Sequence, residues 1–217
     1  NISNISFSYP GSNRKVIQNI FLTIKKGESI GIIGSSGSGK STLVDLIAGL
    51  ISPQEGNILL DETSLDLIKK EWQKNIGYIP QHIFLSDETI LKNVAFGIKN
   101  ADIKILSVKK AIEMAGLNDF VDSLKEGLNS NIGESGVKLS GGQRQRIGIA
   151  RAMYHDPDIL ILDEATGALD ISTEKKIMEK INELKGKKNI IIISHRQTTV
   201  SNCDRIFQIS NGALVKL

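Results

Sequence analysis

The hydrophobic positions of this 217-residue chain form strand-like and helix-like patterns that alternate along the sequence. Apolar residues occupy every second position over residues 20–24, which predicts a strand with one buried face. Residues 159–162 and 189–193 are continuously aliphatic, as in strands at the centre of a parallel sheet with both faces covered. Residues 205–216 place Asn-Gly between two apolar segments, so they predict a hairpin with a tight turn.

A glycine- and serine-rich loop lies between a predicted strand and a predicted helix. The apolar run 29–33 predicts the strand, residues 34–41 form the loop, and the apolar spacing over 43–50 predicts the helix. From about residue 87 to 138 the spacing is helical and no strand pattern interrupts it. The chain therefore combines an α/β core with a helical segment inserted in its middle.

Composition and charge exclude several classes of protein. Hydrophobic residues make up 40% and charged residues 24%, which are ordinary values for a globular protein. The net charge of +3 and the 5% of aromatic residues argue against a basic, base-stacking surface, so we expect no nucleic-acid partner. No apolar run approaches the roughly 20 residues of a membrane-spanning helix. The single Cys203 favours a reducing compartment.

The loop has the spacing of a phosphate-binding motif. Residues 34–41 read GSSGSGKS and fit G-x-x-x-x-G-K-S in the required strand–loop–helix context. Glycines let successive backbone N–H groups point at an anion, and the helix adds the positive end of its dipole. Lys40 would approach the β- and γ-phosphates and Ser41 would ligate Mg²⁺; a purely structural turn is the alternative. The predicted nucleotide contacts are the residues of this loop and the one that follows it: Gly34, Ser35, Ser36, Gly37, Ser38, Gly39, Lys40, Ser41 and Thr42.

Two acids follow the aliphatic run 159–162. Side chains alternate along a strand, so Asp163 and Glu164 are expected to face different ways. We assign Asp163 to Mg²⁺ and Glu164 to the polarisation of an attacking water. The alternative is that the acids only cap the next helix.

A third motif reads Leu139-Ser140-Gly141-Gly142-Gln143. Ser140 and Gln143 have the spacing of a capping box, which predicts the start of a helix. Glycines in the first turn expose backbone amides and allow a phosphate to approach closely. A capped helix without a ligand would show the same pattern.

The order of these motifs resembles the ATP-binding cassette (ABC) ATPases, from Tyr9 to the terminal hairpin. The resemblance implies an α/β fold: a P-loop NTPase core with a mostly parallel sheet, an N-terminal antiparallel β subdomain and an inserted α-helical subdomain. It makes residues 1–217 one ABC ATPase domain, with 1–86 and 154–217 as the ATP-binding core and 87–153 as the insert. It also implies that the signature segment, residues 139–143, contacts the ATP of a second protomer. Two nucleotide-binding domains, identical or different, would then close head to tail around two ATP·Mg²⁺.

Further residues receive roles only through the resemblance. Tyr9 matches the aromatic residue that stacks on adenine, whereas the residue alone suggests a sheet edge; Val16 joins it at the ATP site. Gln81 matches the glutamine that contacts Mg²⁺ or its water. His195 matches a histidine that bonds the γ-phosphate. The implied catalytic residues are Glu164, His195, Lys40 and Gln81, and the implied metal ligands are Ser41, Gln81 and Asp163.

Other segments bear on the partners. Asp170 matches a loop that crosses to the partner subunit, although the family usually has serine at the position of Gly167. Residues 88–94 and 133–136 resemble segments of exporter-type cassettes, whose insert docks on transmembrane domains of the same polypeptide. The chain begins without methionine or a signal-peptide pattern, so we interpret it as a fragment of a longer protein. We expect the ATPase domain of an exporter or flippase at the cytoplasmic face of the cell (inner) membrane.

The sequence leaves alternative functions open. A non-transport ABC ATPase acting on nucleic acid or ribosomes is one, but Lys40 and Ser140 are only 100 positions apart, with no heptad array between them. A P-loop kinase is disfavoured by Glu164 and the signature segment, and an inactive cassette by the presence of all expected catalytic residues. The sequence leaves lipid, oligosaccharide, peptide and drug open as cargo.

Overall fold

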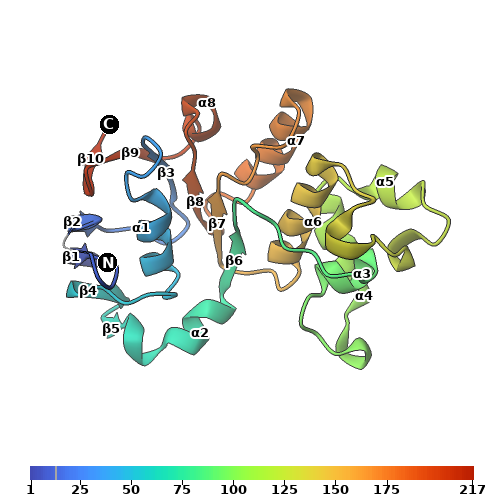
Figure 1. Ribbon diagram of the computed structural model, residues 1–217, viewed down its shortest axis with the longest axis horizontal. Coiled ribbons are helices and arrows are strands. Elements are labelled where there is room, and N and C mark those ends of the chain that lie inside the picture. Colours follow the sequence, from blue (N-terminus) through green and yellow to red (C-terminus); the bar gives the residue numbers. More distant parts are fainter. Residues whose placement is uncertain (13) are drawn as a thin grey trace. The chain divides into compact units, whose positions relative to one another are not determined.

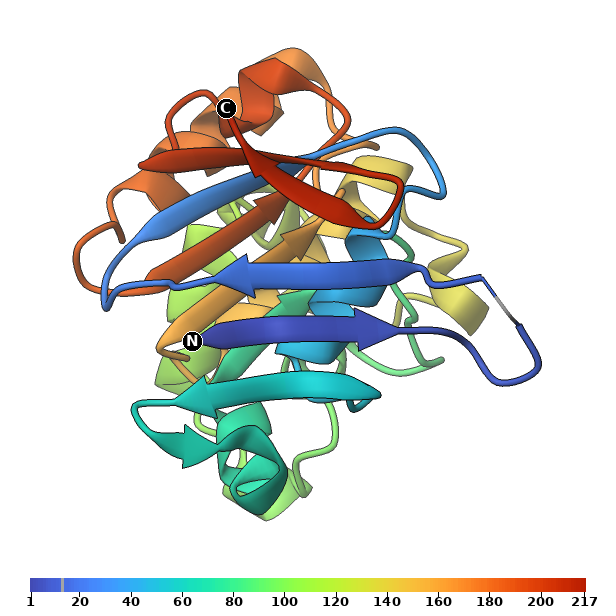
Figure 2. The same cartoon turned by 90° about the vertical axis from the view of Figure 1, so that its left-hand side faces the viewer.

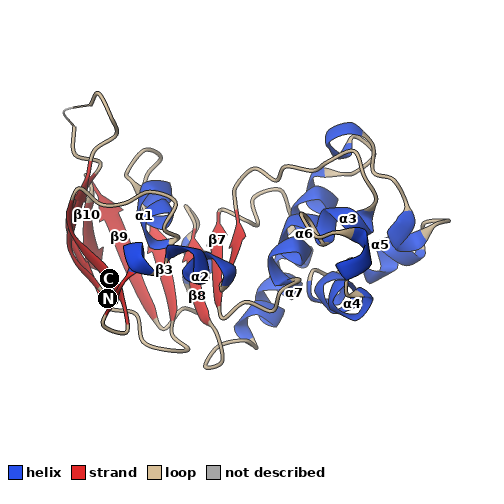
Figure 3. Cartoon of the chain, turned by 90° about the horizontal axis from the view of Figure 1, so that it is seen from below, coloured by secondary structure: helices blue, strands red, loops and turns tan. Residues whose placement is uncertain are grey.

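The computed structural model describes residues 1–12 and 14–217, which form two compact units (Figure 1). The first unit comprises Asn1–Ile76, Asp158–Asp163 and Lys185–Leu217. The second comprises Gly77–Pro157 and Glu164–Leu184. Figure 3 shows the difference in content, with sheets in the first unit and mainly helices in the second.

The N-terminal part of the first unit is a small antiparallel sheet. Its strands lie side by side in the order β2-β1-β4-β5 (Figure 2). The apolar residues Ile5, Ile17 and Ile20 are buried, as a one-sided strand pattern requires. Strand β2 ends at Leu22, so the alternation that continues to Ile24 extends beyond the strand. The bounds are β1 (Ile2–Phe7), β2 (Ile17–Leu22), β4 (Glu55–Leu60) and β5 (Thr63–Ser64).

The second sheet of this unit is mostly parallel, as predicted. Its strands run in the order β10-β9-β3-β8-β7, and β3 pairs in parallel with both β8 and β9. Strand β10 closes the sheet in an antiparallel hairpin with β9; Asn211 and Gly212 both have positive φ, as a tight two-residue turn requires. The bounds are β3 (Ser29–Ile33), β7 (Ile159–Asp163), β8 (Asn189–Ile193), β9 (Arg205–Ser210) and β10 (Ala213–Lys216). Strand β6 (Ile76–Ile79) begins in the first unit and continues into the second.

Helix α1 (Lys40–Ile47) buries the apolar stripe that the sequence predicts, except at its end. Leu43, Leu46 and Ile47 are buried, whereas Leu50 is 53% exposed. The helix ends before Gly49, whose φ of 67° is left-handed, so Leu50 no longer faces the core. The other helices of this unit are short: α2 (Lys69–Lys74), α8 (Gln197–Val200) and a 3₁₀ turn at Leu65–Leu67.

The second unit is helical, as the middle of the sequence predicts. Val108 and Ile112 of α4 and Ile147 of α6 are buried, and α6 packs against both α3 and α4. The bounds are α3 (Ile90–Val94), α4 (Ile105–Met114), α5 (Asn118–Asp122), α6 (Gly141–Met153) and α7 (Ile171–Asn182), with 3₁₀ turns at Asn100–Asp102, Gly127–Asn129 and Glu134–Gly136. Over residues 1–12 and 14–217, every helix is too short or too polar to cross a membrane.

Candidate nucleotide-binding site

The phosphate loop, residues 34–41, joins β3 to α1 in a conformation that depends on its glycines. Gly37 and Gly39 have φ values of 73° and 106°, which side chains rarely adopt. The first helical residue is Lys40, and its N-cap, Gly39, has no side chain to bond the first-turn amides. Those amides can therefore bond an anion, and the helix dipole favours negative charge there.

Two buried polar side chains in this loop fit a phosphate ligand. Lys40 is 7% exposed, and its Nζ donates to the backbone oxygens of Gly34 and Ser35 at 2.9 and 3.0 Å. The Oγ of Ser38 is buried and has no hydrogen-bond partner among the described residues. Since an unbonded buried hydroxyl is costly, an oxygen-rich ligand in the loop would stabilise it.

Tyr9 and Val16 lie beside the phosphate loop in the first unit. The Tyr9 hydroxyl and the Thr42 hydroxyl are 3.0 Å apart and hydrogen-bonded. The Tyr9 ring packs edge-on against Phe7, with ring centroids 5.1 Å apart, and remains 45% exposed. Because β1 ends at Phe7, Tyr9 is not a sheet-edge residue, and its exposed ring can stack on a flat ligand. Val16 lines a cavity of about 250 Å³ together with Gly37 and Ser38 of the loop.

The carboxyl edge of the parallel sheet gathers three predicted site elements. Strands β3, β7 and β8 run in parallel, so the phosphate loop after β3, Asp163 at the end of β7 and His195 beyond β8 share one edge. Open α/β sheets bind ligands at this edge. His195 is exposed there.

Asp163 has an acidic neighbour, Asp45, that lies outside the sequence motifs. Burial raises the pKa of Asp45, and the negative charge of Asp163 raises it further. Asp45 lies on α1 four residues after Ser41, and hence on the same helix face. This spacing is the one feature of the sequence that could have pointed to Asp45. Carboxylate and hydroxyl oxygens are Mg²⁺ ligands, so Asp163 and Ser41 fit this cation. The described residues hold no cluster of three or more His, Cys, Asp or Glu that could bind a metal; a Mg²⁺ here would need the nucleotide's own oxygens.

Glu164 and Gln81 are brought together in the second unit. The Gln81 Nε2 donates to the Glu164 Oε2 at 3.0 Å. Strand β7 ends at Asp163, and Glu164 has a φ of 49°. The expectation that strand alternation orients both acids was therefore wrong for Glu164, which belongs to a left-handed turn. Its carboxylate is oriented by the bond from Gln81 instead.

The signature segment opens α6 as predicted. The capping box is confirmed, since Gln143 N donates to Ser140 Oγ at 3.2 Å and Ser140 N donates to Gln143 Oε1 at 2.9 Å. Gly141 and Gly142 form the first turn, and a Cβ added at either would lie about 3.5–3.6 Å from atoms of Ala168. The signature segment thus lies against the loop after Glu164.

That loop is held by two further residues. Ala168 N donates to Gln145 Oε1 at 3.2 Å, and Gln145 is buried on α6. No sequence pattern indicates Gln145, because its partner is distant in the chain. Asp170 caps α7 by accepting from Thr173 N at 3.0 Å and from Ser172 Oγ at 2.6 Å, and these bonds hold the pKa of Asp170 well below its usual value. A Cβ at Gly167 would make only ordinary contact with Glu164 O, so the family's serine would fit there.

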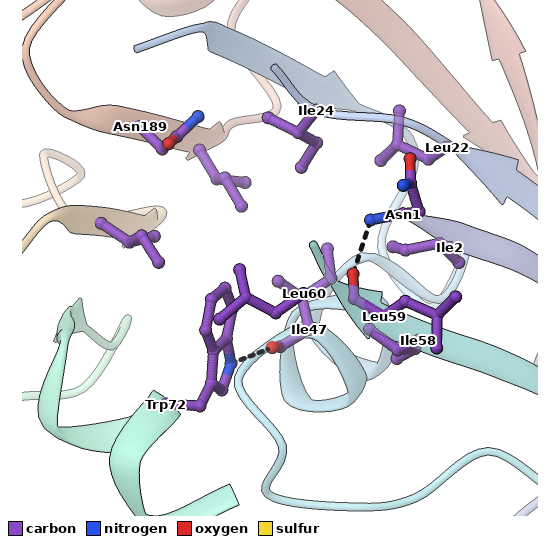
Figure 4. A pocket seen from close by; sticks show the side chains of 12 residues that line it. Asn1, Ile2, Leu22, Ile24, Ile47, Ile58, Leu59, Leu60, Trp72 and Asn189 are labelled. Carbon is purple, nitrogen blue, oxygen red and sulfur yellow. Dashed lines mark hydrogen bonds between the residues drawn. The ribbon is translucent and has the colours of Figure 1, made fainter. Parts of the chain in front are cut away.

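A separate apolar pocket lies in the first unit (Figure 4). At its rim, Trp72 Nε1 donates to Ile47 O at 2.8 Å and the Asn1 amino group donates to Leu59 O at 2.7 Å. None of the predicted nucleotide-contacting residues lines this pocket. The candidate site is therefore the phosphate loop and its sheet edge.

A glycine loop that opens a helix at the carboxyl edge of a parallel sheet, beside an acid and a histidine, defines a P-loop ATPase domain. Comparison of the sequence with family models gives the particular family. Residues 17–167 match the model described as ABC transporter, and the chain belongs to this family as its ATP-binding, ATPase domain.

The similar proteins are named as a flippase, a translocation ATP-binding protein and an exporter. The chain is 42% identical over 214 residues to an ATP-dependent lipid A-core flippase of Ralstonia nicotianae, covering 98% of the chain and 36% of the relative. It is 42% identical over 214 residues to the alpha-hemolysin translocation ATP-binding protein HlyB of Escherichia coli, covering 98% of the chain and 30% of the relative. A bacterial Atm1-family ABC exporter with ATP bound has a TM-score of 0.91 and 33% identity, over 99% of the chain and 37% of the exporter. The chain thus spans about a third of the length of these proteins, and the predicted fold class is confirmed.

Proposed function

We propose that the chain is the ATP-hydrolysing domain of an exporter or flippase, and that two such domains close head to tail around two ATP·Mg²⁺. The observation that carries the proposal is the division of the site residues between the two compact units. The phosphate loop, Asp163 and His195 belong to the first unit, whereas Gln81, Glu164, the signature segment and Asp170 belong to the second. In a head-to-tail pair, the first unit of one copy would face the second unit of the other.

Each unit supplies a distinct set of contacts in this proposal. Tyr9 and Val16 receive the base, and the loop amides with Lys40 bind the phosphates. His195 donates to the γ-phosphate at the sheet edge. Ser140 Oγ and the Gly141 and Gly142 amides bind the γ-phosphate of the partner's nucleotide, because the capping box occupies the Gln143 amide but not the two glycine amides before it.

Hydrolysis is assigned to Glu164 acting as a general base on water. The hydrogen bond from Gln81 orients the Glu164 carboxylate, so this orientation exists before a nucleotide binds. Ser41 and Asp163 would hold Mg²⁺, and Gln81 would reach the ion or its water. When bound, Mg²⁺ supplies positive charge that offsets the charge developing on the phosphate oxygens.

Coupling to transport is proposed through the helical insert, residues 87–153. Phe96 of the insert and Phe84, which precedes the insert in the second unit, are 47% and 66% exposed, and their ring centroids lie 6.2 Å apart. The Arg151 guanidinium lies 4.5 Å from the centre of the Phe96 ring. A paired aromatic surface of this kind suits docking on another protein. We assign it to transmembrane domains at the cytoplasmic face of the membrane, since the similar proteins are named for flipping and translocation.

Mixing two inactive variants tests the proposal. Lys40→Ala damages the phosphate loop and Ser140→Ala damages the signature segment. In a mixed dimer, one site carries both defects and the other is intact, so ATP hydrolysis should exceed that of either variant alone. The control mixes Lys40→Ala with the double variant Lys40→Ala/Ser140→Ala, which cannot form an intact site. If the first mixture shows no recovery, the composite site is wrong.

A further inference from the structure

The C-terminal hairpin lies directly against the phosphate loop in the first unit, although the two are far apart in the sequence. Strand β9 pairs in parallel with β3, and the register places Gln208 beside Ile33. The next residue of each strand is therefore Ile209 and Gly34, where the loop begins. Strand β9 of the hairpin therefore lies beside β3 up to the point where the phosphate loop begins.

Ile209 contacts both ends of the loop. A Cβ added at Gly34 would lie 2.5 Å from Ile209 O and 2.9 Å from Ile209 Cγ2. A Cβ added at Gly39 would lie 3.4 Å from Ile209 Cδ1. Since Ile209 is 1% exposed and fixed in the sheet, the loop is shaped against a rigid surface.

The hairpin turn holds a second support of the loop. Gln18 N donates to Gly212 O at 2.9 Å, and Gln18 Nε2 donates to Asn211 O at 3.2 Å. A Cβ at Gly212 would lie 2.6 Å from Val16 O, and a Cβ at Gly39 would lie 2.9 Å from the same oxygen. The Val16 carbonyl is therefore confined between the hairpin turn and the loop.

The hairpin turn and the phosphate loop also line one cavity of about 250 Å³. Ser38 is among the loop residues that line it. We propose that the β9–β10 hairpin positions the phosphate loop, with Ile209 and Gly212 as positioning residues that hold it in the nucleotide-binding conformation. Nucleotide affinity then depends on a turn that does not itself contact the phosphates. This inference rests on the proposed nucleotide site.

Two glycine substitutions separate positioning from general destabilisation. Gly212→Ala and Gly186→Ala both place a side chain at a left-handed φ, 78° and 76°, so their backbone strain is matched. The Cβ at Gly186 would meet nothing within 4 Å, whereas the Cβ at Gly212 would press on Val16 O. We expect Gly212→Ala to weaken ADP·Mg²⁺ binding about tenfold by calorimetry, and Gly186→Ala to leave it unchanged. Equal affinities in the two variants would overturn the inference.

If the melting temperature shows that Gly212→Ala does not fold, two milder substitutions test the same positioning role. Ile209→Val removes the Cδ1 that lies against Gly39, and Ile190→Val removes the same atom from a buried position on β8. Binding should weaken only with Ile209→Val, at similar losses of melting temperature; equal affinities would again refute positioning. Lys40→Ala serves as the test of the nucleotide site itself. If it binds ADP as tightly as the wild type, the proposed site fails and the positioning role fails with it.

Discussion

At the scale of single residues, Glu164 combines a left-handed backbone with a carboxylate held by Gln81. A residue other than glycine at positive φ is costly and often marks a functional position. The turn places the carboxylate after the end of β7, and the amide donor fixes its orientation. This arrangement suits a general base that must meet a water in one geometry.

Glu164→Gln should keep nucleotide binding and lose turnover. The amide is close to isosteric with the carboxylate but cannot accept the proton of water, and loss of a general base costs on the order of 10²–10⁴-fold. Steady-state phosphate release measures turnover, and calorimetry with ADP·Mg²⁺ checks that binding is retained. Phosphate release at the wild-type rate would remove Glu164 from the mechanism.

Lys40→Ala should weaken binding itself. Lys40 Nζ donates to two backbone oxygens of the loop, so its charge is held at the proposed phosphate site. A hydrogen bond to a charged group contributes about 1.5–3 kcal/mol, which corresponds to about a ten- to hundredfold loss of affinity. The exposed Lys26 provides the control, since Lys26→Ala changes the net charge equally. An ATP affinity equal in the two variants would contradict the assignment.

Because Cys203 is partly buried, we expect the free energy of unfolding to fall at alkaline pH. Burial raises the pKa of the Cys203 thiol from 9.0 to about 11. Below the lower value both states keep the proton; above it the unfolded chain ionises first, so stability falls as pH rises through this window. The loss should reach up to about 2 kcal/mol in urea unfolding at about pH 11 relative to about pH 8. Cys203→Ala is the control for other groups: the wild type should lose more stability than the variant, and equal losses would refute the shift.

At the scale of elements, two helices of the second unit begin with equivalent caps. Ser140 accepts from Gln143 N on α6, and Thr89 accepts from Lys92 N on α3, both at 3.2 Å. Replacement of either cap by alanine should cost about 1 kcal/mol of stability. The caps are therefore matched structurally, whereas only Ser140 is proposed to contact a nucleotide.

Only Ser140→Ala should also lower ATP hydrolysis beyond its effect on folding. Thermal unfolding measures the shared loss of stability, and steady-state hydrolysis measures the difference between the variants. Equal activity in Ser140→Ala and Thr89→Ala would show that Ser140 acts only as a helix cap.

The elements that the sequence predicts well are those specified by local pattern. The aliphatic strands, the hairpin turn at residues 211–212 and the capping box at Ser140 depend on neighbours within a few positions, and the structure confirms them. The errors at Leu50 and Glu164 occur where an element ends one turn or one residue earlier than its pattern. In both cases a left-handed residue ends the element.

Residues whose partners are remote in the chain could not be predicted. Gln145 bonds Ala168, and Ile209 contacts the phosphate loop, but each contact depends on how separate elements pack. A contact between residues that are far apart in the chain produces no local pattern in a single sequence. The site motifs can be predicted because each is formed by neighbouring residues. Gln145 and Ile209, which pack against those motifs, cannot be predicted because their contacts are long-range.

At the scale of the whole molecule, the proposed head-to-tail pair requires two chains for one working site. Each chain carries the phosphate loop on one compact unit and the signature segment on the other. Nucleotide bridging two copies would contribute much of their interface, so association should depend on ATP. Hydrolysis by the wild type should then rise faster than linearly with protein concentration while the monomer predominates.

The most direct test is the sedimentation of Glu164→Gln with and without ATP·Mg²⁺. This variant binds without hydrolysing, so the closed pair should accumulate: a dimer with ATP·Mg²⁺ and a monomer without it. Lys40→Ala under the same conditions should remain monomeric, which ties association to the phosphate loop. A Glu164→Gln chain that binds ATP·Mg²⁺ and still sediments as a monomer would contradict the composite site.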